Sequence, residues 1–253
     1  MKRLLLPLLA ILLCAGPASA RVTYGKDAST KPEAYFSVND QGLDSAALLP
    51  PPPDYNSILF LHDRDMYAYG LSLRGTERAK QAAEDADTKQ LPKVFSKAFG
   101  GEITQEAMPE LFSLLRRAKS ELGSMSTRTA KDTFKRVRPF VLFNDPTCYP
   151  PHEKKLRKQP SYPSGHSSQG WGIALLLAEI NPGRKEIILR RGYEYGQSRV
   201  ICGYHWQSDV DAGRLAAAGG LANLHANPAF LRHLERAKKE FAKLAAQGKV
   251  KTE

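Results

Sequence analysis

The stretch SYPSGHSSQGWGIALLLAEI, residues 161–180, decides the fold. A Pro-Ser-Gly turn at 163–165 opens a run in which Trp171, Ile173 and residues 175–177 recur at helical spacing. This pattern predicts a helix over 164–180, and the same period recurs on both sides of it.

Most of the remaining chain is also predicted to be helical. The expected helices cover 57–70, 76–89, 104–122, 125–136, 164–180, 184–201, 207–226 and 228–246. Thr104 is expected to cap its helix and Gly123 to end it. Pro139 ends the next segment, because proline disfavours helical backbone at Arg138. No convincing run of alternating strands and no internal repeat appears, so the predicted fold class is all-α in one domain.

The N-terminus has the features of a secretion signal. Residues 2–3 are basic, residues 4–15 are largely apolar, and residues 18–20 form a small-x-small cleavage pattern. The apolar run is too short to span a bilayer. An N-terminal anchor helix and, more weakly, a lipid-modified Cys14 are the alternatives. The mature protein is expected to begin near Arg21 and to lie in the periplasm or outside the cell.

Three segments of the chain are therefore predicted. Residues 1–20 are a signal peptide, residues 21–47 an N-terminal arm, and residues 48–253 a helical domain. The proline run at 50–53 is expected to form a stiff polyproline II connector, with a partner-binding role as the minority alternative.

Charge and cysteine content narrow the function further. The net charge is +11, and without residues 2–3 it is +9. Basic proteins bind nucleic acid, membrane surfaces or small anions. No aromatic-basic RNA motif or zinc-finger spacing appears, so small anions, or no specific charged partner, are favoured. Neither a nucleic acid nor a membrane is expected as a partner. After export Cys148 and Cys202 remain, an even number in an oxidising compartment, and they are expected to pair. Two free thiols are the alternative.

Three clusters of polar residues carry phosphate chemistry. They are Lys131 with Arg138-Pro139, then Pro163-Ser164-Gly165-His166, then Ser198-Arg199 with His205 and Asp209. Arginine and lysine bind phosphate oxygens, and a helix N-terminus offers N–H groups to an anion. Two histidines can act as nucleophile and general acid. If residues 205–209 are helical, the carboxylate lies one turn from the nucleophile and can hold its Nδ1–H. Similarly, seven residues from Lys131 to Arg138 are about two helical turns, which puts both cations on one side.

In this order the clusters match, at all eleven specified positions, the signature Lys-x6-Arg-Pro, Pro-Ser-Gly-His, Ser-Arg-x5-His-x3-Asp. The chain thus resembles the acid phosphatase superfamily, which also contains the type 2 phosphatidic acid phosphatases and the vanadium haloperoxidases. The longer stretches 161–166 and 196–214, with 49–53 and 74–76, look like those of class A bacterial non-specific acid phosphatases.

The resemblance implies a helical bundle that hydrolyses phosphomonoesters without a metal or cofactor. His205 would be phosphorylated, Asp209 would orient it, and His166 would protonate the leaving alcohol and then assist water. The implied phosphate ligands are Lys131, Arg138, Ser164, the Gly165 N–H and Arg199. Nucleotides, aryl phosphates and sugar phosphates are the implied substrates, with phosphotransfer to alcohols as a possible side reaction. A homo-oligomer is also implied.

Other functions remain as alternatives. A vanadate-dependent haloperoxidase uses the same anion site, but the class A resemblance argues against it. A membrane-embedded lipid phosphatase is disfavoured because no later stretch has transmembrane length. A non-catalytic anion binder would not need the two histidines with Asp209. The polar residues His-Asp-Arg-Asp at 62–65 are expected to lie exposed on the surface and not to form a metal site.

Overall fold

The computed structural model describes residues 35–36 and 42–253, and every regular element among them is helical. The predicted all-α class is confirmed. The signal peptide and most of the predicted arm lie outside the described residues. None of the described helices combines the length and the apolarity that a bilayer crossing requires.

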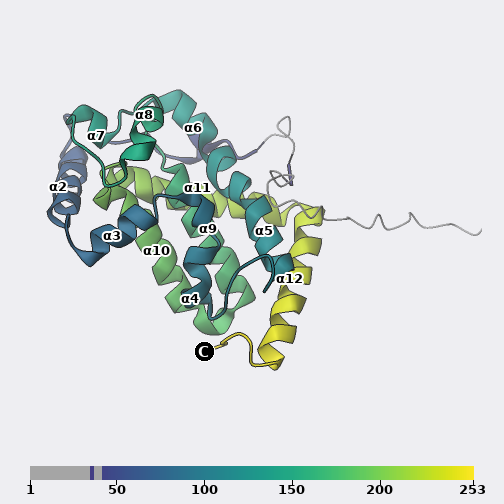
Figure 1. Ribbon diagram of the computed structural model, residues 1–253. Helices are drawn as coiled ribbons and strands as arrows, with labels where there is room; N and C mark the ends of the chain where they lie inside the picture. Colours follow the sequence, from purple (N-terminus) through teal and green to yellow (C-terminus); the bar gives the residue numbers. More distant parts are fainter. Residues whose placement is uncertain (1–34, 37–41) are drawn as a thin grey trace, which may run out of the picture. The chain divides into compact units, whose positions relative to one another are not determined.

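Figure 1 shows the helices, which are connected by turns and by longer loops. In chain order they are α1 (Ser45–Leu48), α2 (Ile58–Ser72), α3 (Glu77–Glu84), α4 (Ser96–Phe99), α5 (Pro109–Ser120), α6 (Ser126–Phe134), α7 (Pro139–Leu142), α8 (Glu153–Leu156), α9 (Gly165–Ile180), α10 (Lys185–Ile201), α11 (Gln207–His225) and α12 (Pro228–Ala246). A π-helical segment, η3 (Glu121–Met125), joins α5 to α6. Single 3-10 turns are η1 (Thr88–Gln90), η2 (Lys93–Phe95), η4 (Pro150–His152) and η5 (Pro182–Arg184).

The predicted boundaries of α9 to α12 agree with the structure to within about one residue, whereas two predictions around α5 are wrong. Thr104 does not cap α5, because its Oγ1 accepts from the N–H of Ala107 at 3.1 Å in a separate turn and α5 begins at Pro109. Proline suits that first position because its missing N–H would have no intrahelical partner there. Gly123 does not end a helix but lies inside η3. A Cβ at Gly123 would lie 2.4 Å from the Gln169 side chain, so the glycine permits close packing of η3 on α9.

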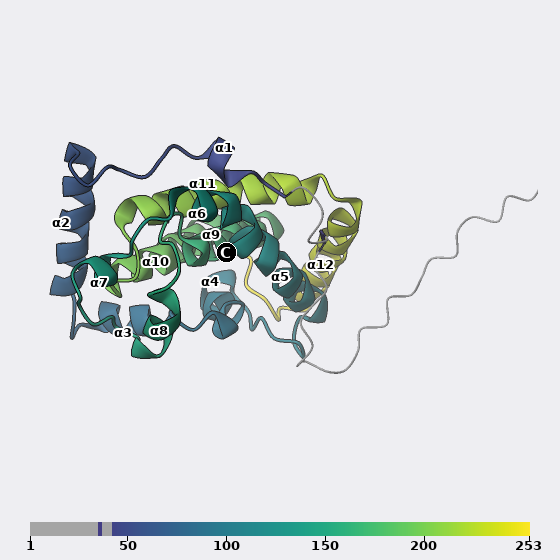
Figure 2. The same cartoon turned by 90° about the horizontal axis from the view of Figure 1, so that it is seen from above.

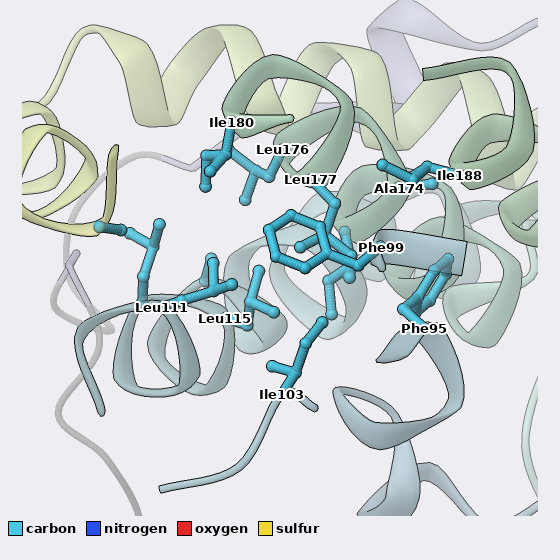
Figure 3. Packing of buried hydrophobic residues seen from close by; sticks show 14 of the residues in the cluster. Phe95, Phe99, Ile103, Leu111, Leu115, Ala174, Leu176, Leu177, Ile180 and Ile188 are labelled. Carbon is cyan, nitrogen blue, oxygen red and sulfur yellow. The ribbon is translucent and has the colours of Figure 1, made fainter. Parts of the chain in front are cut away.

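The core is built around α9, which packs between α10 and α11 (Figures 1 and 2). Ile173, Leu176 and Leu177 of α9 are fully buried in one cluster with apolar side chains of α4, α5 and α10. Figure 3 shows Leu176 and Leu177 in this cluster. Each such side chain contributes about 1.5–3 kcal/mol of burial free energy. The resulting packing fixes the N-terminus of α9, where the Pro-Ser-Gly-His motif lies.

Helix α2, on the left in Figures 1 and 2, packs against α10 and α11. Its buried residues are Phe60, Asp63, Tyr67 and Gly70, which recur at the three- and four-residue spacing of one helix face. The prediction that residues 62–65 lie exposed on the surface is therefore wrong for Asp63, which is 1% exposed. The other three side chains of that run are exposed.

A disulfide joins Cys148 to Cys202, which confirms the predicted pairing. The backbone supports the same contact, because the N–H of Cys148 donates to the carbonyl of Cys202 at 3.1 Å. Both cysteines lie in a small apolar cluster with Phe140 and Tyr204. The disulfide therefore ties the loop at 144–162 to the C-terminal end of α10.

Removing this crosslink should destabilise the protein, because the disulfide closes a loop with a sequence separation of 54. We expect Cys148→Ser/Cys202→Ser to lose up to about 4 kcal/mol of unfolding free energy, measured by urea denaturation. Reducing agent should lower the wild-type midpoint and leave that of the double variant unchanged. A double variant that unfolds at the wild-type urea concentration would contradict this assignment.

Candidate active site

The structure brings the three motif segments together around His205. The N–H of Ser164, at the start of α9, donates to the carbonyl of Asp209 at 2.8 Å. Arg138 Nη1 lies 2.9 Å from His205 Nε2, and the carbonyl of Arg199 accepts from the N–H of His205 at 3.3 Å. Residues that are far apart in the chain thus share one buried site.

His205 lies in the turn between α10 and α11, and Asp209 lies in the first turn of α11. Residues 205–206 are not helical and α11 begins at Gln207, but the side chains of His205 and Asp209 still meet, with Nδ1 3.2 Å from Oδ2. The same carboxylate oxygen accepts from the N–H of Trp206 at 2.9 Å. Because an ionised carboxylate only accepts, Nδ1 carries the ring proton and Nε2 presents a lone pair, to which Arg138 donates.

His166 is the second residue of α9 and is held between two other groups. Its ring stacks on Tyr195, with centroids 4.4 Å apart and planes 5° from parallel. The backbone of Asp85 lies beside the ring and acts against the lowering of its pKa by burial. Nε2 of His166 is buried and has no hydrogen-bond partner among the described residues. Nε2 is left available to another molecule.

Lys131 and Arg138 are both held by backbone carbonyls of the loop that precedes α9. Lys131 Nζ donates to Pro160 O at 3.0 Å and to Ser161 O at 3.2 Å. Arg138 donates to Gln159 O at 3.0 Å and to Pro160 O at 3.1 Å. The carbonyl of Pro160 accepts from both cations, which holds them close to each other.

The expected helical relation between these two cations is wrong. Helix α6 ends at Phe134, Lys135 adopts a left-handed φ of 46°, and Arg138 becomes the N-cap of α7. The two cations are brought to one side by a chain reversal rather than by two turns of one helix.

Arg199 and Ser164 complete the set of potential anion ligands. Arg199 lies over the ring of Tyr204 at 4.2 Å, and its buried Nε and Nη1 have no partner among the described residues. Ser164 caps α9 and accepts from the N–H of Ser167 at 3.2 Å and its hydroxyl at 2.9 Å. The hydroxyl hydrogen of Ser164 is therefore free to donate, beside the N–H of Gly165 at the helix start.

Burial and mutual repulsion lower the pKa values throughout this cluster. Burial, then the charge of Arg138, lowers the pKa of Lys131 to about 7. Burial, then Arg199, lowers the pKa of Arg138 to about 9. The pKa of His205 and that of His166 lie well below the usual range because of burial, then Arg138 for His205 and Arg199 for His166. A bound anion would relieve this repulsion.

Several supporting residues were not found by sequence reasoning. Ser161 Oγ donates to Asp209 Oδ2, and Arg136 Nη1 donates to Asp209 Oδ1 at 2.8 Å. Arg136 in turn binds Asp63 at 2.7 Å. The one available signal was that Asp63 shares a helical stripe with Phe60, Tyr67 and Gly70.

A second buried carboxylate supports the His166 side of the site. Asp85 accepts from Ser198 Oγ at 2.7 Å and from both Nη atoms of Arg191. Its backbone also lies beside the ring of His166, so the motif serine Ser198 and His166 both have Asp85 as a neighbour. No three His, Cys, Asp or Glu side chains are grouped as metal ligands within residues 35–36 and 42–253.

Comparison with known proteins agrees with this geometry. The family model described as "PAP2 superfamily" matches residues 120–228. The chain is 50% identical to the "Non-specific acid phosphatase" of Providencia stuartii over 96% of this chain and 99% of that protein. It is 43% identical to the protein of that name from Salmonella typhimurium, covering 81% of this chain and 83% of the relative. It is 36% identical to the "Acid phosphatase" of Zymomonas mobilis, covering 92% and 89%. The chain therefore belongs to the PAP2 superfamily and, within it, to the non-specific acid phosphatases.

Proposed function

We propose that this acid phosphatase hydrolyses a broad range of phosphomonoesters through a phosphohistidine on His205, without a metal ion. The observation that carries the proposal is the geometry of that ring. Asp209 accepts from Nδ1, so the lone pair of Nε2 is directed at the group that binds beside Arg138. Nucleotides, aryl phosphates and sugar phosphates fit this chemistry, because the proposed ligands would bind the phosphoryl group and not the alcohol.

In the first step, Nε2 of His205 forms a bond to phosphorus while the bond from phosphorus to the alcohol oxygen breaks. Nε2 of His166 supplies the proton that the leaving oxygen needs. The imidazole of His205 gains positive charge, and the carboxylate of Asp209 stabilises it. In the free protein an N–H of Arg138 donates to Nε2 of His205. When the substrate binds, this N–H donates to a phosphate oxygen instead, so the lone pair of Nε2 becomes free to attack.

In the second step, His166 accepts a proton from water as the water oxygen attacks phosphorus. The bond from phosphorus to Nε2 of His205 breaks, and inorganic phosphate leaves. An alcohol in place of water would receive the phosphoryl group instead. The cations Lys131, Arg138 and Arg199, with the Ser164 hydroxyl and the Gly165 N–H, stabilise the charge on the transferring group in both steps.

The preference for acid follows from two groups. Lys131 has a pKa of about 7, so its charged form, which attracts phosphate, predominates below that pH and is lost as the pH rises through it. The pKa of His166 is lowered in the free protein, so it needs acid and the field of a bound phosphate to carry its proton.

Substitution of the nucleophile tests the mechanism. We expect His205→Ala to lower turnover of an aryl phosphate by about three orders of magnitude or more, because no other group can form the covalent intermediate. His225→Ala is the control, since His225 bonds Glu179 at 3.1 Å outside the site. Acid-labile, base-stable phosphoprotein should be trapped from wild type and not from His205→Ala.

A chelator should leave wild-type turnover unchanged. Near-normal turnover by His205→Ala would exclude the covalent mechanism. Loss of activity in chelator that returns on adding a metal would exclude metal independence.

The pKa of Lys131 can be tested with sulfate, which remains a dianion from about pH 8 to about pH 6. We expect the affinity for sulfate, measured by inhibition, to rise as the pH falls across this range, because the ammonium becomes charged. Lys131→Met should bind sulfate weakly and lose most of this pH dependence. The exposed neighbour Lys135, changed to Met, should keep it. An equally steep dependence in Lys131→Met would assign the titration to another group.

We infer that the protein is exported to the periplasm or beyond and that residues 1–20 are removed. The signal features at the N-terminus and the disulfide between Cys148 and Cys202 both suit an oxidising compartment. Intact mass of the protein recovered from the periplasmic fraction should correspond to a chain beginning at Arg21. Recovery of the full-length chain in the membrane fraction would favour an anchor.

A further inference from the structure

Three buried charged side chains connect helix α2 to His205. Arg136 Nη2 donates to Asp63 Oδ2 at 2.7 Å, and Arg136 Nη1 donates to Asp209 Oδ1 at 2.8 Å. The side chains of Asp63 and Arg136 are 1% and 2% exposed, and that of Asp209 is fully buried. Asp209 in turn holds Nδ1 of His205. The arginine therefore bridges two carboxylates, only one of which touches the nucleophile.

Ser208, at the start of α11, forms hydrogen bonds with both Asp63 and Arg136. Its backbone N–H donates to Asp63 Oδ1 at 2.8 Å and its hydroxyl to Asp63 Oδ2 at 2.6 Å. The hydroxyl oxygen accepts from Arg136 Nη1 at 2.7 Å. Both oxygens of Asp63 are thus occupied, so its carboxylate has a single orientation and presents Arg136 to Asp209 at a defined place.

The two oxygens of Asp209 have separate tasks. Oδ2 receives His205, the N–H of Trp206 and the hydroxyl of Ser161. Oδ1 receives Arg136. Without Arg136 the second oxygen would lose this donor, and a buried carboxylate with an unsatisfied oxygen turns toward any other donor within reach. The orientation of the His205 ring would turn with it.

The charges of the group also match the reaction. Asp63 and Asp209 contribute two negative charges and Arg136 one positive charge, so the group is left with one net negative charge beside His205. The imidazole becomes positive when Nε2 bonds phosphorus. Arg136 with Asp209 alone would be neutral, and Asp63 restores the charge that the cationic imidazole needs.

We propose that Asp63 and Arg136 are positioning residues for phosphoryl transfer, acting on His205 through Asp209. The inference rests on the proposed role of His205 as nucleophile. It places a functional residue on α2 (Ile58–Ser72), outside the residues 120–228 that the family model matches. It also gives the buried acid of that helix a task that its packing alone does not require.

The variant Asp63→Asn tests the proposal, because it keeps the shape and removes the charge. We expect kcat to fall about 10- to 100-fold, the loss typical of a small misplacement of reacting groups. KM and the inhibition constant of inorganic phosphate should change by less than about twofold, because Lys131, Arg138 and Arg199 are untouched. Equal losses in kcat and in phosphate binding would mean that the whole site is disturbed and would overturn the proposal.

The matched control is Glu121→Gln. Glu121 is also a buried carboxylate, 4% exposed, but it accepts from the backbone N–H of Tyr35. This variant should lose thermal stability and keep the wild-type kcat. A kcat loss of the same size in the control would assign the Asp63→Asn effect to general destabilisation.

A double-mutant cycle with Asp209→Asn separates positioning from a structural role. If Asp63 acts through Asp209, adding Asp63→Asn to Asp209→Asn should lower kcat by no more than about twofold further. Independent, multiplicative losses would contradict the proposal. Because the cycle compares turnover within one background, a shared loss of stability does not mimic the expected result.

Ser208→Ala provides a milder test that keeps every charge, and it decides the question if Asp63→Asn does not fold. It removes one donor from Asp63, so we expect a kcat loss of about three- to tenfold, with KM and phosphate inhibition unchanged. Wild-type kcat in Ser208→Ala and Asp63→Asn, with His205→Ala inactive, would overturn the positioning role alone. Turnover by His205→Ala would instead overturn the underlying mechanism.

Discussion

The buried carboxylate of Asp209 is the interaction on which the site depends. A charge without exposure to water is costly unless donors surround it, and here His205, the N–H of Trp206, Ser161 and Arg136 do so. The backbone carbonyl of the same residue receives the N–H of Ser164. One residue therefore fixes the start of α11, the start of α9 and the orientation of His205, the proposed nucleophile.

The cations of the site impose the opposite constraint. Lys131, Arg138 and Arg199 lie close enough for their charges to lower the pKa values within the site. Carbonyls at 159–161 accept hydrogen bonds from Lys131 and Arg138, which partly offsets the repulsion in the free protein. The loop that supplies these carbonyls is anchored by the disulfide to the end of α10. Repulsion among these fixed cations destabilises the free protein, and in the proposed mechanism a bound phosphoryl group would offset it, as expected for electrostatic preorganisation.

Two of the supporting residues, Asp63 and Asp85, lie outside the part of the chain that the family model matches. The family model covers 120–228, which includes the whole signature and the supporting residues Arg136, Ser161 and Ser208. Asp63 on α2 and Asp85, which directly follows α3, reach into that region from the N-terminal side, one toward Asp209 and one toward His166 and Ser198. Signature residues can be recognised from their spacing alone. Their supports cannot, because a buried acid can be supplied by any element that packs nearby.

The amino-acid sequence by itself determined the all-α class, the position of helices such as 164–180 and 228–246, the pairing of Cys148 with Cys202, and which polar residues form the signature. The helices follow from local periodicity, the disulfide from the even number of cysteines that remain after export, and the signature from fixed residue spacing. Only the tertiary structure decided that Gly123 lies within η3, that a chain reversal after Phe134 brings Lys131 and Arg138 to one side, and that Asp63 is buried against Arg136. Each of these outcomes depends on a partner far away in the chain, such as Gln169 or Asp209, and the free energy of meeting that partner outweighs the weak local preference of the residue itself.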